Sequence, residues 1–441
     1  MNREAYKLPN RIVSALGCAA VLGLFAWWLR QNTHTGALGI LAAAASAGLF
    51  LALGLRYVPS FTAFWTPSDE PAADRAEPKY MAARIFVAVL AWDMLVLLLA
   101  WLLRRAFGHA GGFAKTLDFW RCLDSGHYLA IADDWYLSVG DRSRVVQLVF
   151  LPGYPLLIRL GRLLTGDTLT GGLLTAALCF AGAACLLYRL LRLEYSHAIA
   201  LRCVVLLCLW PGSFFFAAPM SESLFLLLSL GCLLLARKGH FLPAALCGAY
   251  AAFTRSLGLT LIVPLVMELF HGGFHWKKAL PIALVPLGFA AYLAVNVQVS
   301  GNAFQFMVYQ SEHWGQRLGF FWNTASYQAN RAASTFAENP HNFFGLWLPN
   351  LLAGFGALGL MLWAAPRLRA SYTAWFIAYF VIAIGPTWLL SAPRYLLAMP
   401  TLPLAAALAG EDRRVRTVAA PLLAAASAAY FIMFLLRWQV W

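Results

Sequence analysis

Long apolar stretches, separated by short polar loops, recur along the chain from Ile12 to the C-terminal residues. Most approach the roughly 20 residues that a helix needs to cross the apolar core of a bilayer. The first stretch lacks the build of a cleavable signal peptide, so we expect it to remain as a span. The pattern predicts about thirteen membrane-spanning helices, at residues 12–30, 36–55, 84–103, 168–188, 199–216, 222–236, 242–254, 257–270, 279–297, 343–363, 372–390, 395–410 and 417–436.

Two of these stretches, 242–254 and 257–270, are too short to cross a membrane alone. We interpret them as a broken pair of half-helices that turns over inside the protein, with Arg255 at the turn. A cation inside a membrane is costly, so Arg255 predicts an anionic partner nearby.

Composition supports an all-α polytopic membrane protein. Hydrophobic residues make up 61% of the chain and charged residues 12%, with a mean hydropathy of +0.68, outside the range of soluble globular proteins. Lys and Arg in short loops fall on one side if the N-terminus is cytoplasmic, and an odd number of spans then puts the C-terminus outside. The net charge of +14 follows from this topology and from attraction to anionic lipids, so we expect membrane lipids and no nucleic acid as partners.

The spans divide the chain unequally. We expect residues 1–83 to form an N-terminal two-helix extension with a cytoplasmic linker, and residues 84–441 to form the main transmembrane domain. Two larger loops, 104–167 and 300–342, interrupt that domain on the outer side. Seven of the eight cysteines lie within predicted spans, where they behave as small hydrophobic residues, and the spacing gives no disulfide framework and no metal motif.

The first outer loop concentrates ionisable residues in "CLDSGHYLAIADDW", residues 122–135. Asp124 and His127 are three residues apart, so their side chains share a face if this piece is a helix. Leucines and two arginines then alternate at helical spacing in "VFLPGYPLLIRLGRLLTG", 149–166, which is typical of a helix that lies flat in the membrane interface. A carboxylate and an imidazole would thus sit where a lipid head group can enter.

These motifs resemble the PIG-V-like mannosyltransferases, the family of the second mannosyltransferase of GPI-anchor synthesis and its bacterial relatives. The resemblance starts with "FWRCLDSGHYLAIADDWY" and "VFLPGYPLLIRL" and covers roughly Asp118 to Pro400. Cys122 and Leu123 stand where the family usually has Arg-Trp, and Trp135 stands where it has glycine. Later blocks follow in the family's order: "PMSESLF" (219–225), "FTRSLGL" (253–259), "GNAFQFMVYQSEHWGQR" (301–317) and "PRYLLAMP" (393–400).

The resemblance implies a GT-C glycosyltransferase fold and an enzyme that uses a polyprenyl-phosphate sugar, commonly mannose, on the non-cytoplasmic side, in a bacterial plasma membrane. An inverting transfer needs one base, and Asp124 with His127 is the expected catalytic pair. The phosphate leaves as an anion and needs cations, for which Arg255 and Arg394 are suited. Further substrate contacts are expected from six residues: Arg121, Tyr128, Tyr154, Glu222, Trp314 and Arg317.

The acceptor is expected to be a glycan, a glycolipid or a protein. No cofactor is firmly implied, and recruitment of a divalent ion by loop carboxylates stays open. The alternative functions are the same fold with another sugar or acceptor, a lipid-linked-sugar transporter or flippase, and a non-enzymatic assembly subunit. A transporter typically shows two related halves and a polar path through the membrane, whereas here polar residues gather in two unequal loops on one side.

Several candidates also have ordinary structural interpretations. Asp124 could cap a helix, and Ser221 with Glu222 could do the same for the next one. His127 could bond a loop carbonyl, and Arg394 could mark the membrane edge. Tyr128, Tyr136 and Tyr154 could belong to an interfacial belt, Asp133 and Asp134 could be solvated, and Asp93 could pair with another helix.

Overall fold

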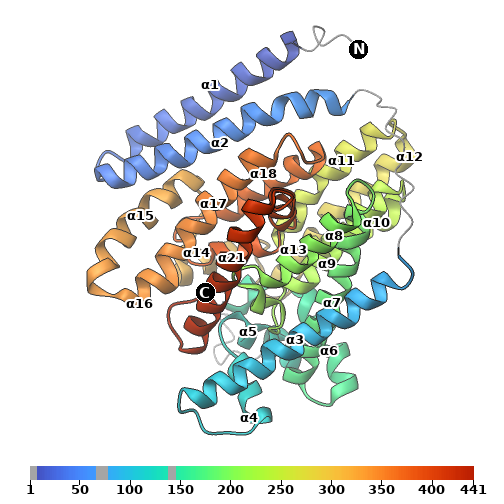
Figure 1. The fold of residues 1–441 in the computed structure, drawn as a ribbon, viewed down its shortest axis with the longest axis vertical. Helices are drawn as coiled ribbons and strands as arrows, with labels where there is room; N and C mark the ends of the chain where they lie inside the picture. The colour runs from blue at the N-terminus through green and yellow to red at the C-terminus, as the bar shows by residue number, and fades with distance from the viewer. Residues whose placement is uncertain (1–6, 66–77, 138–145) are drawn as a thin grey trace.

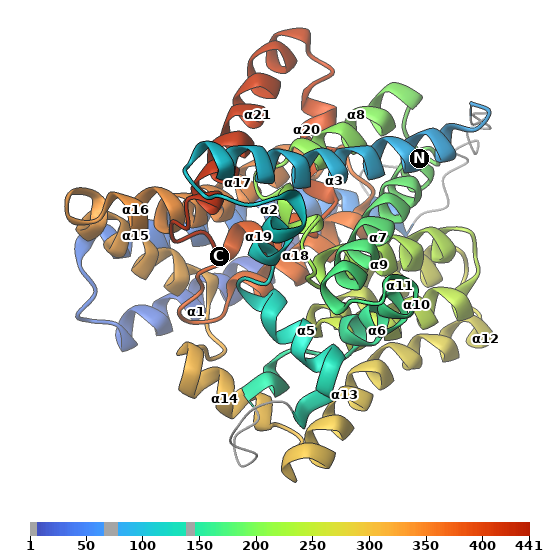
Figure 2. The ribbon, with the colours of Figure 1, turned by 90° about the horizontal axis from the view of Figure 1, so that it is seen from below.

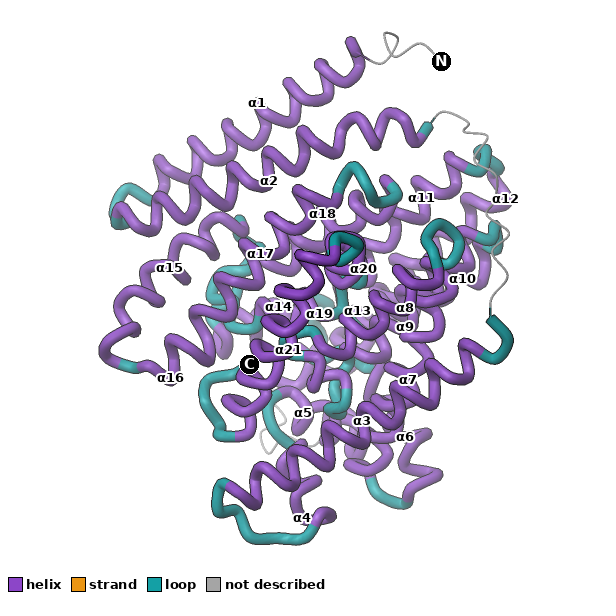
Figure 3. The backbone as a smooth tube through the Cα atoms, viewed as in Figure 1, coloured by secondary structure: helices purple, strands orange, loops and turns teal. Residues whose placement is uncertain are grey.

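The computed structural model describes residues 7–65, 78–137 and 146–441. Every regular element in these ranges is helical, without a β-strand (Figure 3). The predicted all-α fold class is therefore confirmed.

Seven helical segments are long and apolar enough to cross a membrane, which describes an integral membrane protein. The expected number of about thirteen complete spans is not confirmed, because the remaining apolar stretches form shorter helices. The seven are α1 (Lys7–Gln31), α2 (Ala37–Phe64), α3 (Met81–Ala106), α7 (Thr168–Leu191), Trp276–Ser300 with α12 (Trp276–Ala279) and α13 (Leu284–Ser300), Pro340–Ala364 with α17 (Leu348–Ala364), and α21 (Arg413–Leu435).

The shorter apolar helices pack against the longer ones and against one another (Figures 1 and 2). Two of them, α9 and α10, make extensive contacts with each other, and α9 also packs on the long helix α7 and α10 on the long helix α13. These shorter helices are α8 (His197–Leu209), α9 (Glu222–Arg237), α10 (Phe241–Thr254), α11 (Ile262–His271), α18 (Ala370–Ile384), α19 (Ala392–Leu397) and α20 (Thr401–Ala409).

Two predicted spans end early for local reasons. The stretch 199–216 was expected to be one span, but α8 ends at Leu209, because Pro211 and Gly212 follow and Gly212 adopts a φ of +91°. The stretch 395–410 is divided between α19 and α20 at Pro400. Neither is a continuous helix of spanning length.

The helix break at Arg255 is confirmed. α10 ends at Thr254, and Arg255 is extended, with φ −149° and ψ 136°. A 3-10 segment, Ser256–Leu261, then leads into α11. It folds directly onto α10, since a Cβ atom at Gly258 would lie 2.3 Å from the backbone nitrogen of Ala252. Arg255 is thereby held at the turn between two short helices.

The two outer loops contribute further helices. The first loop forms α4 (Phe113–Leu117), α5 (Asp124–Asp134) and α6 (Gly153–Thr165), and the second forms α14 (Gln305–Trp314) and α15 (Phe321–Glu338). The predicted helix over the leucine and arginine stretch is confirmed in α6, which leaves Leu163 and Leu164 largely exposed and buries Ile158. Figure 2 shows α5 beside α6.

The N-terminal extension is packed on the main domain along the length of α2 (Figure 1). Near its start, Gly39 lies against the side chains of Ser326 and Asn330 of α15. Near its end, the Tyr57 hydroxyl donates a hydrogen bond of 3.1 Å to the carbonyl of Ala370. The extension therefore contacts both the second outer loop and the opposite end of the bundle.

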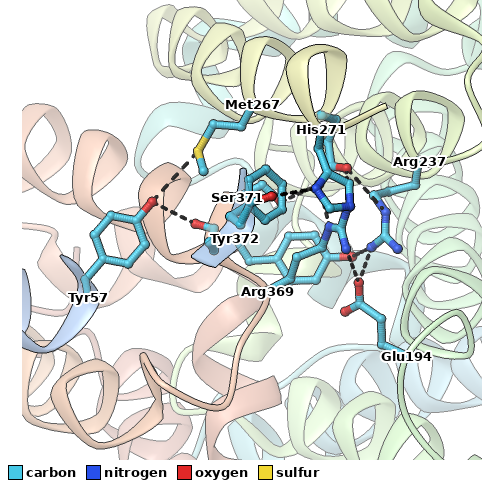
Figure 4. A network of polar contacts seen from close by, with 11 residues as sticks. Tyr57, Glu194, Arg237, Met267, His271, Arg369, Ser371 and Tyr372 are labelled. Carbon is cyan, nitrogen blue, oxygen red and sulfur yellow. Dashed lines mark hydrogen bonds and ion pairs between the residues drawn. The ribbon is translucent and has the colours of Figure 1, made fainter. Parts of the chain in front are cut away.

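A buried charge network lies near that opposite end (Figure 4). Its members come from α9, α11 and α18 and from the loops that precede α8 and α18. Arg369 binds both carboxylate oxygens of Glu268, at 2.7 and 2.8 Å, and Ser371 donates to the same group at 2.5 Å. Arg237 pairs with Glu194 and lies 3.5 Å from Glu268. We refer to these five residues as the Glu268 network.

Candidate active site

Asp124 is the first residue of α5 and is placed by a backbone turn. Leu123, directly before it, has a φ of +53°, which is uncommon for a residue other than glycine. The Asp124 carboxylate makes no capping hydrogen bond with α5 and forms an ion pair with Arg394, 270 residues further along the chain. Helix capping is therefore not what this carboxylate does in the structure.

Four charged side chains continue from this pair as an alternating chain. The Nε atom of Arg394 lies 3.1 Å from Oε1 of Glu222, and Nη1 of Arg255 donates to the same oxygen at 2.6 Å. Relative exposure is 1% for Glu222, 6% for Arg394 and 9% for Arg255, whereas the Asp124 side chain is 26% exposed. We call Asp124, Arg394, Glu222 and Arg255 the Asp124 cluster.

The Asp124 cluster is electrically balanced and open at one end. Two carboxylates offset two guanidinium groups, which lowers the cost of burying charge. Arg394 binds Oδ2 of Asp124, and no hydrogen-bond donor among the described residues reaches the other oxygen, Oδ1. One carboxylate oxygen at the exposed end is thus available to a ligand. The anionic partner that the sequence predicts for Arg255 is Glu222.

Ser221 connects the cluster to the first outer loop. Its hydroxyl is 3.3 Å from Nη1 of Arg255 and 3.0 Å from the hydroxyl of Tyr128. The side chain makes no helix-capping hydrogen bond. The guanidinium of Arg255 also lies over the ring of Tyr395, 5.3 Å from its centroid. These contacts fix the arginine from several sides.

His127 belongs to an aromatic wall beside Asp124. Its ring stacks on Phe150, with centroids 4.5 Å apart and an interplanar angle of 14°. Burial lowers the pKa of His127, although the nearby Asp124 carboxylate acts in the opposite direction. Trp314 of the second outer loop packs its ring edge-on against Phe150, with centroids 6.0 Å apart. The structure thus brings together predicted residues from both loops.

All three tyrosines that could belong to an interfacial belt, Tyr128, Tyr136 and Tyr154, are buried inside the protein. The hydroxyl of Tyr154 donates to the carbonyl of Gly172 at 2.9 Å, and the hydroxyl of Tyr136 donates to the carbonyl of Phe150 at 2.7 Å. Burial raises the pKa of Tyr154 well above its ordinary value, so the phenol stays protonated. Tyr136 thus supports the segment that carries Phe150, and Tyr154 joins α6 to α7.

Arg121 and Arg317 form contacts apart from the Asp124 cluster. Arg121 lies 3.4 Å from Asp118 and 3.8 Å from Asp167. Nε of Arg317 donates to Ser311 within the second loop, at 2.9 Å. The described residues give neither arginine an interaction with Asp124 or Glu222.

Three further aspartates behave differently from one another. Asp133 is exposed and pairs with Arg162 at 2.8 Å, and Asp134 is exposed at the end of α5. Asp93 is 1% exposed within α3, and its Oδ2 has no hydrogen-bond partner in the described part of the chain. The predicted pairing of Asp93 with another helix is therefore absent at this atom.

The sequence interpretation missed Phe150 and Tyr395, which line the site next to His127 and Arg255. A signal for both was present, because each lies within a motif that carries the family resemblance, "VFLPGYPLLIRL" and "PRYLLAMP". An aromatic residue in a membrane protein gives no indication of which polar group it faces, so the motif alone did not single them out.

Comparison with known proteins supports the sequence resemblance. A family model described as Mannosyltransferase (PIG-V) matches residues 121–311, a range that contains Asp124, His127, Glu222 and Arg255. No curated protein matches the chain significantly. A crystal structure of ArnT from Cupriavidus metallidurans, bound to undecaprenyl phosphate, aligns with a TM-score of 0.48 and 19% sequence identity, over 76% of this chain and 61% of that chain.

The family match includes residues 121–167 of the first outer loop and the break at Arg255. It ends before the block that contains Arg394, so that residue is joined to the matched region by its ion pair with Asp124. Over residues 121–311, the chain is similar to the PIG-V mannosyltransferases, which confirms the resemblance carried by its motifs.

Proposed function

We propose that the chain is a membrane-embedded inverting glycosyltransferase of the GT-C type, which moves mannose from polyprenyl-phosphate-mannose to a hydroxyl of an extracytoplasmic acceptor. The observation that carries this proposal is a partly exposed carboxylate, Asp124, which lies within the region that matches the mannosyltransferase family and is held by the buried cation Arg394. The acceptor would be a glycan, a glycolipid or a protein, and the membrane would be a bacterial plasma membrane.

Asp124 would act as the general base. Its Oδ1 atom would accept the proton of the acceptor hydroxyl while that oxygen forms a bond to C1 of the sugar. The bond between C1 and the phosphate oxygen breaks on the opposite face, and the phosphate leaves with the bonding electrons. A single displacement inverts the configuration at C1, and no second carboxylate is required as a nucleophile.

Arg394 and Arg255 would supply the positive potential that the leaving phosphate requires. Arginine suits this role because its fork binds phosphate oxygens in pairs and because it stays charged when buried. Glu222 accepts contacts from both arginines and is almost fully buried. It would therefore act on the substrate through the arginines, as a positioning residue.

The aromatic wall would hold the sugar. Trp314 and Phe150 are arranged edge to face next to His127, and aromatic faces suit the apolar faces of a sugar ring. Because burial lowers the pKa of His127, the imidazole would be neutral near pH 7 and could share a hydrogen bond with a sugar hydroxyl. Tyr128 packs edge to face on Phe150, with centroids 5.4 Å apart, and would support this wall. Arg121, Arg317 and Tyr154 make no contact with His127, Phe150 or Trp314 among the described interactions and would contribute through loop structure.

The test is mannosyl transfer by the purified chain in proteoliposomes, supplied with radiolabelled polyprenyl-phosphate-mannose and a membrane glycan extract. Wild-type protein should transfer the label to a product with inverted configuration at C1, determined by NMR. Asp124→Asn should abolish transfer. The control is Asp134→Asn, which makes the same change at an exposed aspartate at the other end of α5 and should retain transfer.

Other results would overturn the proposal. Donor that crosses the bilayer without transfer would identify a flippase. Product with retained configuration would require a covalent intermediate. Equal transfer by the wild type and Asp124→Asn would remove Asp124 from the chemistry.

A further inference from the structure

The helix that carries Arg394 is short and needs support from the rest of the protein. α19 has only six residues, and Arg394 is the third of them. A helix of this length is not stable by itself, so its position depends on tertiary contacts. Asp124 and Glu222 hold the guanidinium of Arg394, but the backbone that carries this side chain has to be held separately.

Asn350 provides a large part of that support from another helix. It lies in α17 and is 1% exposed. Its Oδ1 atom accepts a hydrogen bond of 2.6 Å from the backbone N–H of Ala392, and its Nδ2 atom donates one of 3.1 Å to the carbonyl of Leu390. One amide side chain thus holds the backbone on both sides of Ser391, at the start of α19.

α19 has no cap from its own neighbours in the chain. The side chain of Ser391, directly before the helix, makes no capping hydrogen bond within the described residues. The second residue of the helix, Pro393, has no N–H. An N-terminal cap satisfies a backbone N–H that otherwise lacks a partner. Asn350 takes this role for Ala392 from 42 positions earlier in the chain.

The second outer loop binds the same segment slightly upstream. The N–H of Thr387 donates to the carbonyl of Arg317 at 2.9 Å, and the N–H of Arg317 donates to Oγ1 of Thr387 at 2.9 Å. Nε2 of Gln328 donates to the carbonyl of Leu389 at 3.0 Å. The loop that carries Trp314 of the aromatic wall therefore also holds the approach to α19.

We propose that Asn350 is a positioning residue for Arg394, which it serves by fixing the start of α19 against α17. The inference rests on the proposed function, in which Arg394 holds the base and meets the leaving phosphate. An amide suits this task because it carries an acceptor and a donor side by side, whereas a leucine of similar size has neither. Misplacing a reacting group by about 1 Å can slow a reaction about 10²-fold, so loss of the amide should reach the chemistry through Arg394.

A double-mutant cycle separates positioning from a purely structural role. In Asn350→Leu two buried backbone groups lose their partners, which weakens the fold whatever Arg394 does. Changes that act through one contact do not add, whereas independent changes do. Transfer rates per folded molecule would be compared for the wild type, Asn350→Leu, Arg394→Gln and the double variant. Asn350→Leu should lower kcat about 10²-fold alone and should have little further effect in Arg394→Gln.

Hydrogen exchange gives a second measurement, which needs no sugar transfer. The full chain would be placed in nanodiscs, and peptides that cover α19 would be followed by mass spectrometry. The amide of Ala392 and those of the helix after it should exchange up to about tenfold faster in Asn350→Leu, because the lost hydrogen bond no longer keeps this turn closed.

Asn296→Leu is the matched control. Asn296 of α13 is also fully buried, and its amide bridges the backbone in the same way. Its Nδ2 atom donates to the carbonyl of Tyr292 at 3.1 Å, and its Oδ1 atom accepts from the N–H of Phe306 at 3.2 Å. Exchange in α19 should stay at the wild-type level in this variant, and any loss of rate should be the same with and without Arg394→Gln.

Faster exchange in α19, together with a loss of rate that disappears in Arg394→Gln, would support the proposal. Unchanged exchange in Asn350→Leu, a wild-type rate, or a loss by the same factor in both backgrounds would overturn it. Asn350→Ser, a milder change, is judged by the same two measurements if Asn350→Leu does not fold. A wild-type chain that transfers no mannose would overturn the proposed function, whereas unchanged exchange would overturn the role of Asn350 independently of it.

Discussion

The Asp124 cluster and the Glu268 network are built from the same residue types at opposite ends of one helix. Glu222 begins α9 and Arg237 ends it, 16 residues that span about 24 Å. Each group alternates buried carboxylates with guanidinium groups. Their difference lies in how completely the carboxylates are engaged.

The carboxylate of Glu268 is saturated. It accepts two hydrogen bonds from Arg369 and one from Ser371, and its side chain is 4% exposed. The carboxylate of Asp124 has one oxygen engaged and is 26% exposed. A fully satisfied buried network fixes structure, whereas a partly engaged carboxylate at the edge of a balanced cluster can still accept a proton. The comparison predicts a structural role for the Glu268 end of α9, and it supports the proposal that places the chemistry at the Asp124 end.

The largest effect on stability is expected from Glu268→Gln. The change leaves Arg369 with a neutral partner in a buried position, which typically costs about 3 kcal/mol of the free energy of unfolding. Thermal unfolding of the purified protein should show a clearly lowered Tm. Glu312→Gln, an exposed residue of α14, is the control and should leave the Tm unchanged. If the Tm of Glu268→Gln equals that of the wild type, the Glu268 network does not stabilise the fold as the comparison requires.

Arg394→Gln should have the next largest effect, which is a loss in the rate of transfer. It removes the cation that contacts both Asp124 and Glu222, so the base loses its position and the leaving phosphate loses a charge partner. Loss of one group that stabilises developing charge typically lowers kcat by about 10² to 10³. Initial rates per folded molecule measure this. Arg394→Lys should recover only part of the rate, because lysine has no fork; full recovery would contradict the geometry.

Gly153→Ala should have an intermediate effect on both the Tm and the rate of transfer. A Cβ atom there would lie 2.4 Å from Oγ1 of Thr254, the residue before Arg255. Forcing α6 away from α10 is expected to cost about 1–3 kcal/mol and to slow transfer by moving Arg255. The matched control is Gly112→Ala, which meets no atom within 4 Å. If both variants unfold at the same temperature, close approach of the helices is not what places Arg255.

The smallest expected effect concerns pH and His127. Burial lowers the pKa of the folded imidazole below the value of about 6.5 that unfolded histidine has. The resulting stability is present above about pH 6.5 and is lost as the pH falls, because the unfolded chain then binds the proton more readily. The Tm of His127→Gln should therefore fall less than the Tm of the wild type on acidification. An identical decrease in both proteins would place the titration elsewhere.

Much of the helical framework follows from local sequence. Apolar stretches of spanning length form helices because a membrane leaves the backbone no other way to satisfy its polar groups, and the break at Arg255 follows from two stretches that are each too short. Pro211 and the positive φ of Gly212 end α8 before the predicted boundary, because backbone conformation at these residues outweighs continued hydropathy.

The pairing of charges could not be predicted from the sequence in the same way. Asp124 and Arg394 were both identified as candidates, but their ion pair joins residues 270 positions apart. Hydropathy does not fix the rotation of a helix that is apolar on all sides, so partners across the bundle stay unspecified. For the same reason the sequence indicates only a topological role for the Lys and Arg residues of the short loops, although the structure buries two of them, Arg237 and Arg369, in the Glu268 network.

The most direct test compares the rate of mannosyl transfer per folded molecule in Asp124→Asn and Glu268→Gln, in one membrane preparation. Removing a general base should lower the rate about 10²- to 10⁴-fold in Asp124→Asn without a comparable fall in Tm. Glu268→Gln should lose stability and keep the wild-type rate for the molecules that remain folded. Transfer by Asp124→Asn at the wild-type rate, or an equal loss of rate in both variants, would contradict the assignment of chemistry to the Asp124 end.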